Sequence, residues 1–359
     1  MKAVFILCQD YPSDSNKYAM AFVHPRVKGY IEAGLQAAVI SFATSHDYIY
    51  DGVNIYTVKE GLNKIKKESQ IVLISHAPNI KKHLLFICRI WRYVYRLIFF
   101  FHGHEILSTK NYYPKPYIFN KKSNDEYVKL QAYDYIKLPI MKLFLKCFLK
   151  SRKCDLVFVS QWMLQAGSVS LGIKFTKFPN IYVINNSINP YIKEGGYSYN
   201  NAKGDFITIR PLDQSKYAID LVVEFARKHP LYSFHIYGKG DYFKYNDKPN
   251  NVSIYNDFLS PKDIPTILDS YKYALMPTRL DAQGVMMCEM AVYGIPTIVS
   301  DISVCHEMLD QYENVLFVSN DNFDISFDKL PHQLSKPRFD FSFENTICKE
   351  VNLLQKYCK

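Results

Sequence analysis

Two acidic residues in the C-terminal half of the chain have a spacing that could serve chemistry on one extended ligand. Asp281 and Glu289 are separated by seven residues, and Gly284 lies between them. The apolar run 273–277 ahead of them predicts a buried strand that ends in a turn, and the run 295–300 predicts the next strand. We therefore predict a strand, a loop, a helix that begins near Gly284, and a second strand.

The predicted helix start has the properties of an anion-binding site. The first N–H groups of a helix have no partner within the helix and lie at the positive end of its dipole, and a glycine lets a ligand approach the backbone closely. The amides of Val285 and Met286 could therefore hold a phosphate, while Asp281 and Glu289 bind hydroxyl groups of the same ligand. The alternative is an ordinary βαβ unit with two unrelated acids, and this spacing alone favours that alternative.

Basic residues and glycines at two earlier strand ends support the first interpretation. Arg210 follows a predicted strand at 205–209, and Lys216 follows six residues later, across a turn. A guanidinium offers a planar fork to phosphate oxygens and an ammonium offers a point charge, so the pair suits a diphosphate. Gly238 and Gly240 follow the next predicted strand and allow close approach to the backbone. The alternative is a pair of solvated cations.

At these residues the sequence resembles the donor-binding domain of retaining GT-B glycosyltransferases, and glycosyltransferase family 4 in particular. Residues 289–296, EMAVYGIP, are similar to the family's E-A-M-A-x-G-x-P signature, and Asp281 takes the place of the Glu that precedes it by eight positions. Arg210 and Lys216 resemble the family's G-R-L…K-G pair without its glycines, and residues 238–240 resemble its G-x-G turn.

The resemblance implies a role for each of these residues. Arg210 and Lys216 would hold the diphosphate of a nucleotide-sugar donor, together with the amides that follow Gly284. Glu289 would bind the ribose hydroxyls and Asp281 a hydroxyl of the donor sugar. Residues 257–260 would form the wall for the nucleotide base. Retention of configuration at the anomeric carbon is implied by the resemblance alone.

The loop after the first predicted strand, 3–8, is a further candidate. It carries Asn16 and Lys17, where the family often has glycines close to the donor phosphates. Lys17 could supply charge in the place where glycines supply amides, and an ordinary solvated loop is the equal alternative. The opening lacks G-x-G-x-x-G, which argues against a dinucleotide site.

His102 follows a predicted strand at 97–101, at the end of the strand where open α/β sheets bind ligands. It resembles a family histidine that lies in the cleft, which implies that it orients the donor sugar or the acceptor hydroxyl. A metal site made of His102, His104 and Glu105 is poorly supported, because this spacing fits no helical zinc motif.

The predicted elements describe two doubly wound α/β domains, and 359 residues are enough for both. The resemblance implies that they are the two Rossmann-like domains of a GT-B fold, facing each other across a cleft. We assign 1–190 to an N-terminal acceptor-side domain, 191–204 to a linker and 205–340 to the donor-binding domain. Residues 341–359 would form a C-terminal helix that returns to the N-terminal domain, as in the family.

Two segments of the N-terminal domain, 81–96 and 137–153, are predicted as basic helical surfaces that could touch an anionic membrane. Their basic residues recur every three or four positions: Arg89, Arg92 and Arg96, then Lys142, Lys146 and Lys150. The alternative is a pair of sheet-covering helices whose basic side chains extend into water. Residues 111–134 are polar and aromatic, and we predict an irregular acceptor-side loop there.

The composition limits the possible partners. The net charge of +10 indicates an anionic partner, but no basic tail or nucleic-acid motif appears, so nucleic acid ranks last. The eight cysteines form no C-x-x-C pair and favour a reducing compartment. No signal peptide or membrane span is predicted. We expect a cytoplasmic protein that works at the inner face of the cell membrane.

We therefore predict a glycosyltransferase that moves a sugar from a UDP- or GDP-linked donor to a glycan or lipid-linked acceptor in bacterial surface polysaccharide synthesis. No Asp-x-Asp occurs in the chain, so we expect no metal ion and no cofactor. One alternative is a nucleotide-sugar epimerase of the same architecture. A second is a catalytically silent nucleotide-binding subunit, because Asp281 replaces a Glu and the first-loop glycines are missing.

Overall fold

The computed structural model describes residues 2–17, 19–200, 202–256 and 259–358, which form two compact units. Unit 1 contains Met1–Ser108, Tyr133–Ser187 and Phe343–Lys359, and unit 2 contains Thr109–Ala132 and Ile188–Ser342. Asp257 and Phe258, within the predicted base wall, lie outside the described residues.

Unit 1 is built on an eight-stranded sheet. Its strands are β1 Ala3–Cys8, β2 Ala37–Ser41, β3 Tyr48–Tyr50, β4 Val53–Tyr56, β5 Ile71–His76, β6 Val94–Phe101, β7 Cys154–Phe158 and β8 Ile181–Val183. They lie in the order β3–β4–β2–β1–β5–β6–β7–β8, and all neighbours pair in parallel apart from β3 and β4. The central strands are continuous apolar runs because both of their faces are covered.

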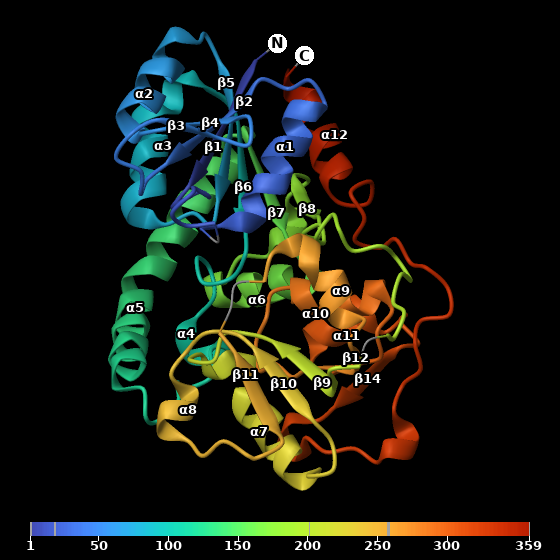
Figure 1. The fold of residues 1–359 in the computed structure, drawn as a ribbon. Coiled ribbons are helices and arrows are strands. Elements are labelled where there is room, and N and C mark those ends of the chain that lie inside the picture. The colour runs from blue at the N-terminus through green and yellow to red at the C-terminus, as the bar shows by residue number, and fades with distance from the viewer. Residues whose placement is uncertain (1, 18, 201, 257–258, 359) are drawn as a thin grey trace. The chain divides into compact units, whose positions relative to one another are not determined.

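Helices cover both faces of this sheet, as Figure 1 shows, with α1 (His24–Glu32) and α12 (Ile347–Cys358) on one side and α2 (Val58–Lys67) and α3 (Leu85–Ile90) on the other. The remaining turns and helices of unit 1 are η1 Ala21–Val23, η2 Ile80–Leu84, η3 Trp91–Tyr93, α6 Gln161–Leu171 and η4 Phe175–Lys177. The segment 81–96, predicted as a helical surface, is thus made of a π-helical turn, a short α-helix, a 3₁₀ turn and the start of β6.

Unit 2 is built on a six-stranded sheet. Its strands are β9 Gly204–Ile209, β10 Phe234–Tyr237, β11 Val252–Tyr255, β12 Tyr271–Met276, β13 Thr297–Ser300 and β14 Val315–Val318. They lie in the order β11–β10–β9–β12–β13–β14 and all pair in parallel. This is the doubly wound order 3-2-1-4-5-6, in which the winding direction reverses between the first and fourth strands, here β9 and β12.

The helices of unit 2 follow these strands in alternation. They are α4 Thr109–Tyr112, η5 Ser215–Tyr217, α7 Ile219–Lys228, α8 Tyr242–Tyr245, η6 Pro261–Asp263, α9 Ile264–Leu268, α10 Val285–Tyr293, α11 Ser303–Leu309, η7 Asn320–Asn322 and η8 Phe327–Lys329. The prediction of two parallel α/β domains is confirmed. The α/β pattern also continues past residue 301, through α11 and β14.

Helix α5 corrects two local predictions. It runs without interruption from Lys121 to Lys150 and contains Pro139 in its interior. The expectation of an irregular loop at 111–134 is therefore wrong for most of that segment, and the helix predicted at 137–153 begins earlier, at Lys121. The first half of this helix could not be recognised in the sequence, because only the second half is amphipathic enough to show a helical period.

The segment Thr109–Ala132 includes the first residues of α5 and belongs to unit 2, whereas the rest of α5 belongs to unit 1. Tyr117 and Phe119 pack there against Tyr242, with ring centroids 5.2 and 5.6 Å away, and Phe119 stacks on Tyr245 at 5.0 Å. This grouping differs from our assignment of the whole range 1–190 to one domain.

The row of arginines predicted at Arg89, Arg92 and Arg96 does not form, because Arg96 lies in β6. Its guanidinium is buried and bonds the carboxylate of Asp155 on β7, with 2.7 Å between Arg96 Nε and Asp155 Oδ2. Arg89 and Arg92 remain exposed. The apolar strand begins three residues earlier than its hydrophobic run suggests.

A buried ion pair fastens α12 to α1 within unit 1. Arg26 Nε donates to Glu350 Oε1 over 2.9 Å, Arg26 Nη2 donates to Asn186 Oδ1 over 2.9 Å, and the Tyr30 hydroxyl donates to the same carboxylate. The two helices are close because Gly29 has no side chain; a Cβ there would lie 2.5 Å from Ile347 Cγ2. Burial raises the pKa of Glu350, and the charge of Arg26 opposes that shift.

Removing the carboxylate by Glu350→Leu should lower the free energy of unfolding of unit 1 by about 3–5 kcal/mol, because Arg26 would stay buried without its charge partner. The double variant Arg26→Met/Glu350→Leu should recover most of that loss. Urea unfolding followed by tryptophan fluorescence measures both, since Trp91 and Trp162 lie in unit 1. Glu344→Leu, at an exposed position, is the control. Equal stability of the single variant and wild type would contradict the expectation.

Candidate functional site

The predicted donor-site residues of unit 2 gather where its winding direction reverses. Arg210 directly follows β9, and the loop 277–284 follows β12, the adjacent strand in the sheet. Loops that leave two such strands diverge and open a crevice at their carboxyl ends, which is where doubly wound sheets bind ligands. The two halves of the predicted site therefore come from sequence positions about 70 residues apart and meet at one sheet edge.

Arg210 is a buried cation with unused hydrogen-bonding capacity. Its side chain is 5% exposed, and its Nη2 donates a long bond of 3.4 Å to the carbonyl of Met276. Its Nε has no acceptor among the described residues. Burial lowers the pKa of Arg210, and the negative charge of Asp281 opposes that shift. A buried guanidinium with a free donor is costly unless an anion completes it.

Lys216 lies on the turn η5 beside Arg210. Its Nζ is 4.7 Å from the centroid of the Tyr217 ring, and the guanidinium of Arg210 is 5.4 Å from the same centroid. The Lys216 carbonyl accepts from the Arg279 N–H over 2.8 Å and from Thr278 Oγ1 over 3.0 Å. The loop after β12 therefore holds the turn that carries the second cation.

A second set of contacts braces this turn, and sequence reasoning missed it. Arg279 forms two bonds to the carboxylate of Asp220 at 2.8 and 2.6 Å, and its Nη1 donates to the carbonyl of Ser215 over 3.0 Å. The Tyr117 hydroxyl, from the segment Thr109–Ala132, donates to Asp220 Oδ1 over 2.8 Å. An arginine one residue after Thr278 and an aspartate in the first turn of α7 were visible in the sequence, but nothing there indicated their pairing.

The predicted glycine turn has a packing reason of its own. A Cβ on Gly238 would lie 1.8 Å from the carbonyl oxygen of Arg210, so only glycine lets the two strand ends approach. Gly240 has a φ of +145°, and a Cβ there would meet the Asp213 carboxylate at 2.8 Å. Both glycines thus shape the loop that carries Arg210; their contact with a donor remains a prediction.

The helix start has the predicted geometry. Gly284 has a φ of +73° and precedes α10, so the amides of Val285 and Met286 are in its first turn. Asp281 lies in the loop ahead of it, and its Oδ1 accepts from the N–H groups of Ala282 and Gln283 over 2.8 and 3.3 Å. One oxygen of this carboxylate is therefore engaged in shaping the loop.

Glu289 lies in the second turn of α10 and is 5% exposed. Its Oε1 accepts from the backbone N–H of Asn189 over 2.8 Å. Burial raises the pKa of Glu289 to about 7, and the bond from Asn189 opposes the shift. This carboxyl group is therefore held at a fixed place and titrates near neutral pH.

In unit 1, His102 follows β6 beside His76, the last residue of β5. His102 Nε2 is 3.1 Å from His76 Nδ1, and its ring packs on Phe22 with 4.6 Å between centroids. The backbone N–H of His102 donates to the Glu105 carboxylate. Burial holds the pKa of His102 well below its ordinary value, with the charges of Arg26 and His104 adding to that effect, so its imidazole is neutral.

His104 is exposed, and the structure places its Nδ1 3.5 Å from Glu105 Oε2. No group of three His, Cys, Asp or Glu side chains suited to a metal ion occurs within the described residues. The pair His76 and His102 was not predicted; a histidine at the end of each of two neighbouring strands was the available signal.

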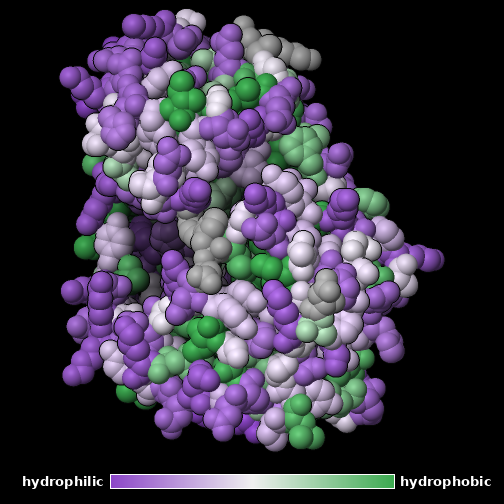
Figure 2. All heavy atoms as spheres, viewed as in Figure 1, coloured by the Kyte–Doolittle hydropathy of each residue, from purple (hydrophilic) through white to green (hydrophobic). Residues whose placement is uncertain are grey.

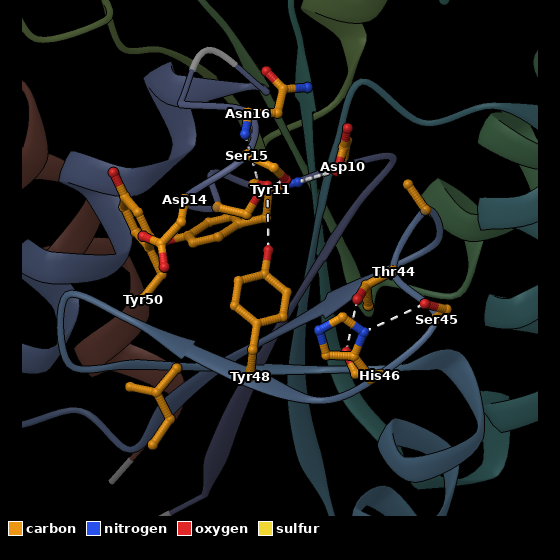
Figure 3. Close-up of a pocket in the computed structure, with 13 residues that line it drawn as sticks. Asp10, Tyr11, Asp14, Ser15, Asn16, Thr44, Ser45, His46, Tyr48 and Tyr50 are labelled. Atoms are coloured by element: carbon orange, nitrogen blue, oxygen red, sulfur yellow. Dashed lines mark hydrogen bonds between the residues drawn. The ribbon is translucent and has the colours of Figure 1, made fainter.

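Asn16 and Lys17 are exposed in the loop after β1. Asn16 closes a turn with Ser13, whose two backbone bonds measure 3.2 and 3.1 Å, and it lines a cavity of unit 1 together with Asp10 and Asp14 (Figure 3). Lys17 is not among the residues that line this cavity. Asn16 therefore shares its cavity with two carboxylates, and the predicted contact of this loop with donor phosphates stays a prediction.

Residues 207–332 match the family described as "Glycosyl transferases group 1". This match includes Arg210, Lys216, Asp281 and Glu289, and so spans both loops at the sheet edge. Residues 207–332 therefore form a domain of the group 1 glycosyltransferase type. A comparison with curated proteins finds no match.

Solved structures show that the fold of this glycosyltransferase is GT-B. Sucrose-phosphate synthase from Thermosynechococcus elongatus is 10% identical with a TM-score of 0.65, covering 90% of this chain and 87% of that chain. WaaG, a glycosyltransferase involved in lipopolysaccharide biosynthesis, is 10% identical with a TM-score of 0.56, covering 88% and 86%. A trehalose-6-phosphate structure from E. coli, bound with UDP-2-fluoro glucose, is 11% identical with a TM-score of 0.55, covering 90% and 89%.

Glu289 should make the stability of this glycosyltransferase depend on pH. The pKa of Glu289 in the folded state is raised from 4.5 to about 7. Its contribution to the free energy of unfolding is therefore complete below pH 4.5 and is lost as the pH rises through about 7. Unit 2 of the wild type should therefore lose about 3 kcal/mol relative to Glu289→Gln between about pH 5 and pH 8. Hydrogen exchange of the α10 amides measures this difference.

Glu307→Gln, an exposed acid on α11, is the control for the loss of one charge and should show no such trend. A difference between Glu289→Gln and wild type that stays constant over this pH range would show that Glu289 has an ordinary pKa.

Proposed function

We propose that this glycosyltransferase moves a sugar from a UDP- or GDP-linked donor to a glycan or lipid-linked acceptor, with retention of configuration and without a metal ion. We further propose that it acts in the synthesis of a bacterial surface polysaccharide such as O-antigen or capsule. The observation that supports the donor site is the position of Arg210, which is buried beside Lys216 at the switch point of the sheet. Its Nε lacks an acceptor among the described residues.

The bond that breaks joins the anomeric carbon to the donor diphosphate, and its electron pair stays on the diphosphate. Arg210, Lys216 and the amides of Val285 and Met286 would neutralise that charge in a site of low dielectric constant. The absence of Asp-x-Asp from the sequence supports the assignment of this role to protein cations and amides.

The remaining roles follow the family resemblance. Glu289, held by Asn189, would bind the ribose hydroxyls, and Asp281 would use its second oxygen on a hydroxyl of the sugar. His102, as a neutral imidazole, would accept a hydrogen bond from the acceptor hydroxyl that forms the new bond to the anomeric carbon. The structures bound with UDP-2-fluoro glucose and linked to lipopolysaccharide synthesis support the substrate class and the pathway class.

Lys216→Ala and Glu289→Gln should each lower the rate of sugar transfer by about 100-fold or more, because each removes one group that the transition state needs. A thermal-shift screen over UDP-, GDP- and ADP-sugars selects the donor, and a radiolabelled-sugar transfer assay with a membrane lipid extract as acceptor gives the rates. Lys262→Ala, an exposed lysine of unit 2, is the matched control.

Wild-type rates in both variants would remove the donor assignment. A new nucleotide sugar formed without acceptor would indicate the epimerase, and nucleotide binding without any turnover would indicate the silent subunit.

We also propose that unit 1 contacts an anionic membrane through α3 and α5, in the ranges 81–96 and 137–153. Trp91 packs on Phe148 with 5.0 Å between centroids, so the two helices are neighbours. Each range combines exposed apolar and basic side chains. The first contains Leu85, Arg89 and Arg92; the second, taken together with the preceding turn of α5, contains Tyr135, Ile136, Leu143, Lys146 and Lys150.

No helix in the described part of the chain has both the length and the apolar character to span a membrane. The face seen in Figure 2 is mostly hydrophilic, with hydrophobic residues in isolated groups.

Lys146→Glu/Lys150→Glu should weaken co-sedimentation with phosphatidylglycerol vesicles by several fold, because each lysine near an anionic surface contributes about 1 kcal/mol. The wild type should bind phosphatidylcholine vesicles weakly, and added salt should reduce its binding to phosphatidylglycerol. Lys262→Glu supplies the same charge change in unit 2. If this control weakened vesicle binding as much as the double variant, α5 would not be the contact surface.

A further inference from the structure

Unit 1 contains a cavity of about 460 Å³ at the carboxyl ends of β1 and β2 (Figure 3). One wall is the loop that follows β1. The other consists of the connection between β2 and β3, which includes His46, and of β3 itself, which ends at Tyr50. This volume lies within the range of about 300–1,000 Å³ that is usual for small-ligand sites. The position is also where open α/β sheets bind ligands, since β1 borders the switch point between β1 and β5.

The charge of this cavity differs from that of the chain. The protein carries a net charge of +10, yet the described residues that line the cavity include Asp10 and Asp14 and neither lysine nor arginine. Two carboxylates at one site repel a phosphate and attract a group that donates hydrogen bonds or carries positive charge. The anionic ligand that the whole chain favours therefore does not belong here.

The hydrogen-bonding groups lead to the same class of ligand. An ionised carboxylate only accepts hydrogen bonds. Asp10 Oδ1 accepts from the Tyr11 N–H over 2.8 Å, which fixes the carboxylate at the cavity wall and leaves its second oxygen for a ligand. Asp14 is exposed at the opposite side of the loop. A ligand that fits must supply donors, as hydroxyl or ammonium groups do.

Tyrosine rings complete the wall and are held in place. The Tyr48 hydroxyl donates to the carbonyls of Tyr11 and Pro12 over 3.2 and 3.1 Å, as Figure 3 shows for Tyr48 and Tyr11. Burial and the charge of Asp10 raise the pKa of Tyr48 to about 12, so this donor stays protonated. The Tyr11 hydroxyl lies 2.9 Å from His24 Nδ1. Fixed aromatic faces beside acceptor oxygens match the C–H faces and hydroxyl edges of a sugar ring.

We propose that this cavity binds a saccharide unit of the acceptor that carries no negative charge, either a neutral sugar or an amino sugar. The proposal rests on the proposed glycosyl transfer and gives the class of its acceptor. It replaces the prediction that the loop with Asn16 and Lys17 holds the donor phosphates.

Saturation-transfer NMR on the full chain tests this with methyl glycosides of a hexose, a hexosamine and a hexuronic acid. The wild type should bind the hexoside or the hexosaminide at least 10-fold more tightly than the hexuronide. Asp10→Asn/Asp14→Asn should lower that binding at least 10-fold, while Glu32→Gln, an exposed acid of unit 1 outside the cavity, should leave it unchanged. Preference between the first two glycosides shows whether an ammonium group is recognised.

Calorimetry with UDP and GDP on the same proteins separates this proposal from the proposed function. Nucleotide binding that is equal in wild type and in Asp10→Asn/Asp14→Asn is the expected result. Nucleotide binding that falls in this variant would assign the cavity to the donor and overturn the proposal. Equal binding of hexuronide and hexoside, or no glycoside binding by a wild type that binds nucleotide, would also overturn it. Failure of the wild type to bind any nucleotide would instead count against the donor site of unit 2.

Discussion

The proposed donor site depends on one buried cation, Arg210, whose hydrogen-bonding capacity is not filled by the described residues. Arg210 lies at the switch point of the second sheet, where its Nη2 makes a long bond to Met276 and its guanidinium contacts the Tyr217 ring; within the part of the chain that the structure describes, its Nε has no acceptor. Its loop can hold this position because Gly238 lets the next strand end pass against the Arg210 carbonyl. The negative charge of Asp281, in the neighbouring loop, opposes the effect of burial on the pKa of Arg210 and so helps to keep the guanidinium charged.

Around Arg210, several polar side chains bind the backbone of the loops or one another. Arg279 and Thr278 bind the turn that carries Lys216, Asp220 anchors Arg279, and Asp281 caps its own loop. Such contacts set the positions of Lys216 and of the first amides of α10, the groups proposed to bind the diphosphate. A site arranged in this way loses little freedom when the diphosphate binds.

Sequence reasoning predicted the parallel strands of both sheets well, because β1, β5 and β9 are apolar runs whose burial leaves few alternatives. It missed the β3–β4 hairpin although Asp51 and Gly52 form the Asp-Gly turn typical of one, both with positive φ. It did not show that Asn16 lines a cavity with Tyr48 and Tyr50, because the proximity of the first loop to β3 appears only in the fold. Pairings such as Arg279 with Asp220 have no local period and cannot be read from spacing.

The division of the chain has a practical consequence for anyone who wants to study the halves apart. The backbone passes between the two units four times, at 108/109, 132/133, 187/188 and 342/343. A cut at 187/188 alone would leave the first fragment without α12 and its Glu350, and the second without Tyr117 and Phe119 against Tyr242. Neither fragment would be a finished domain, and a split enzyme would have to be reassembled from pieces that each expose an unfilled core.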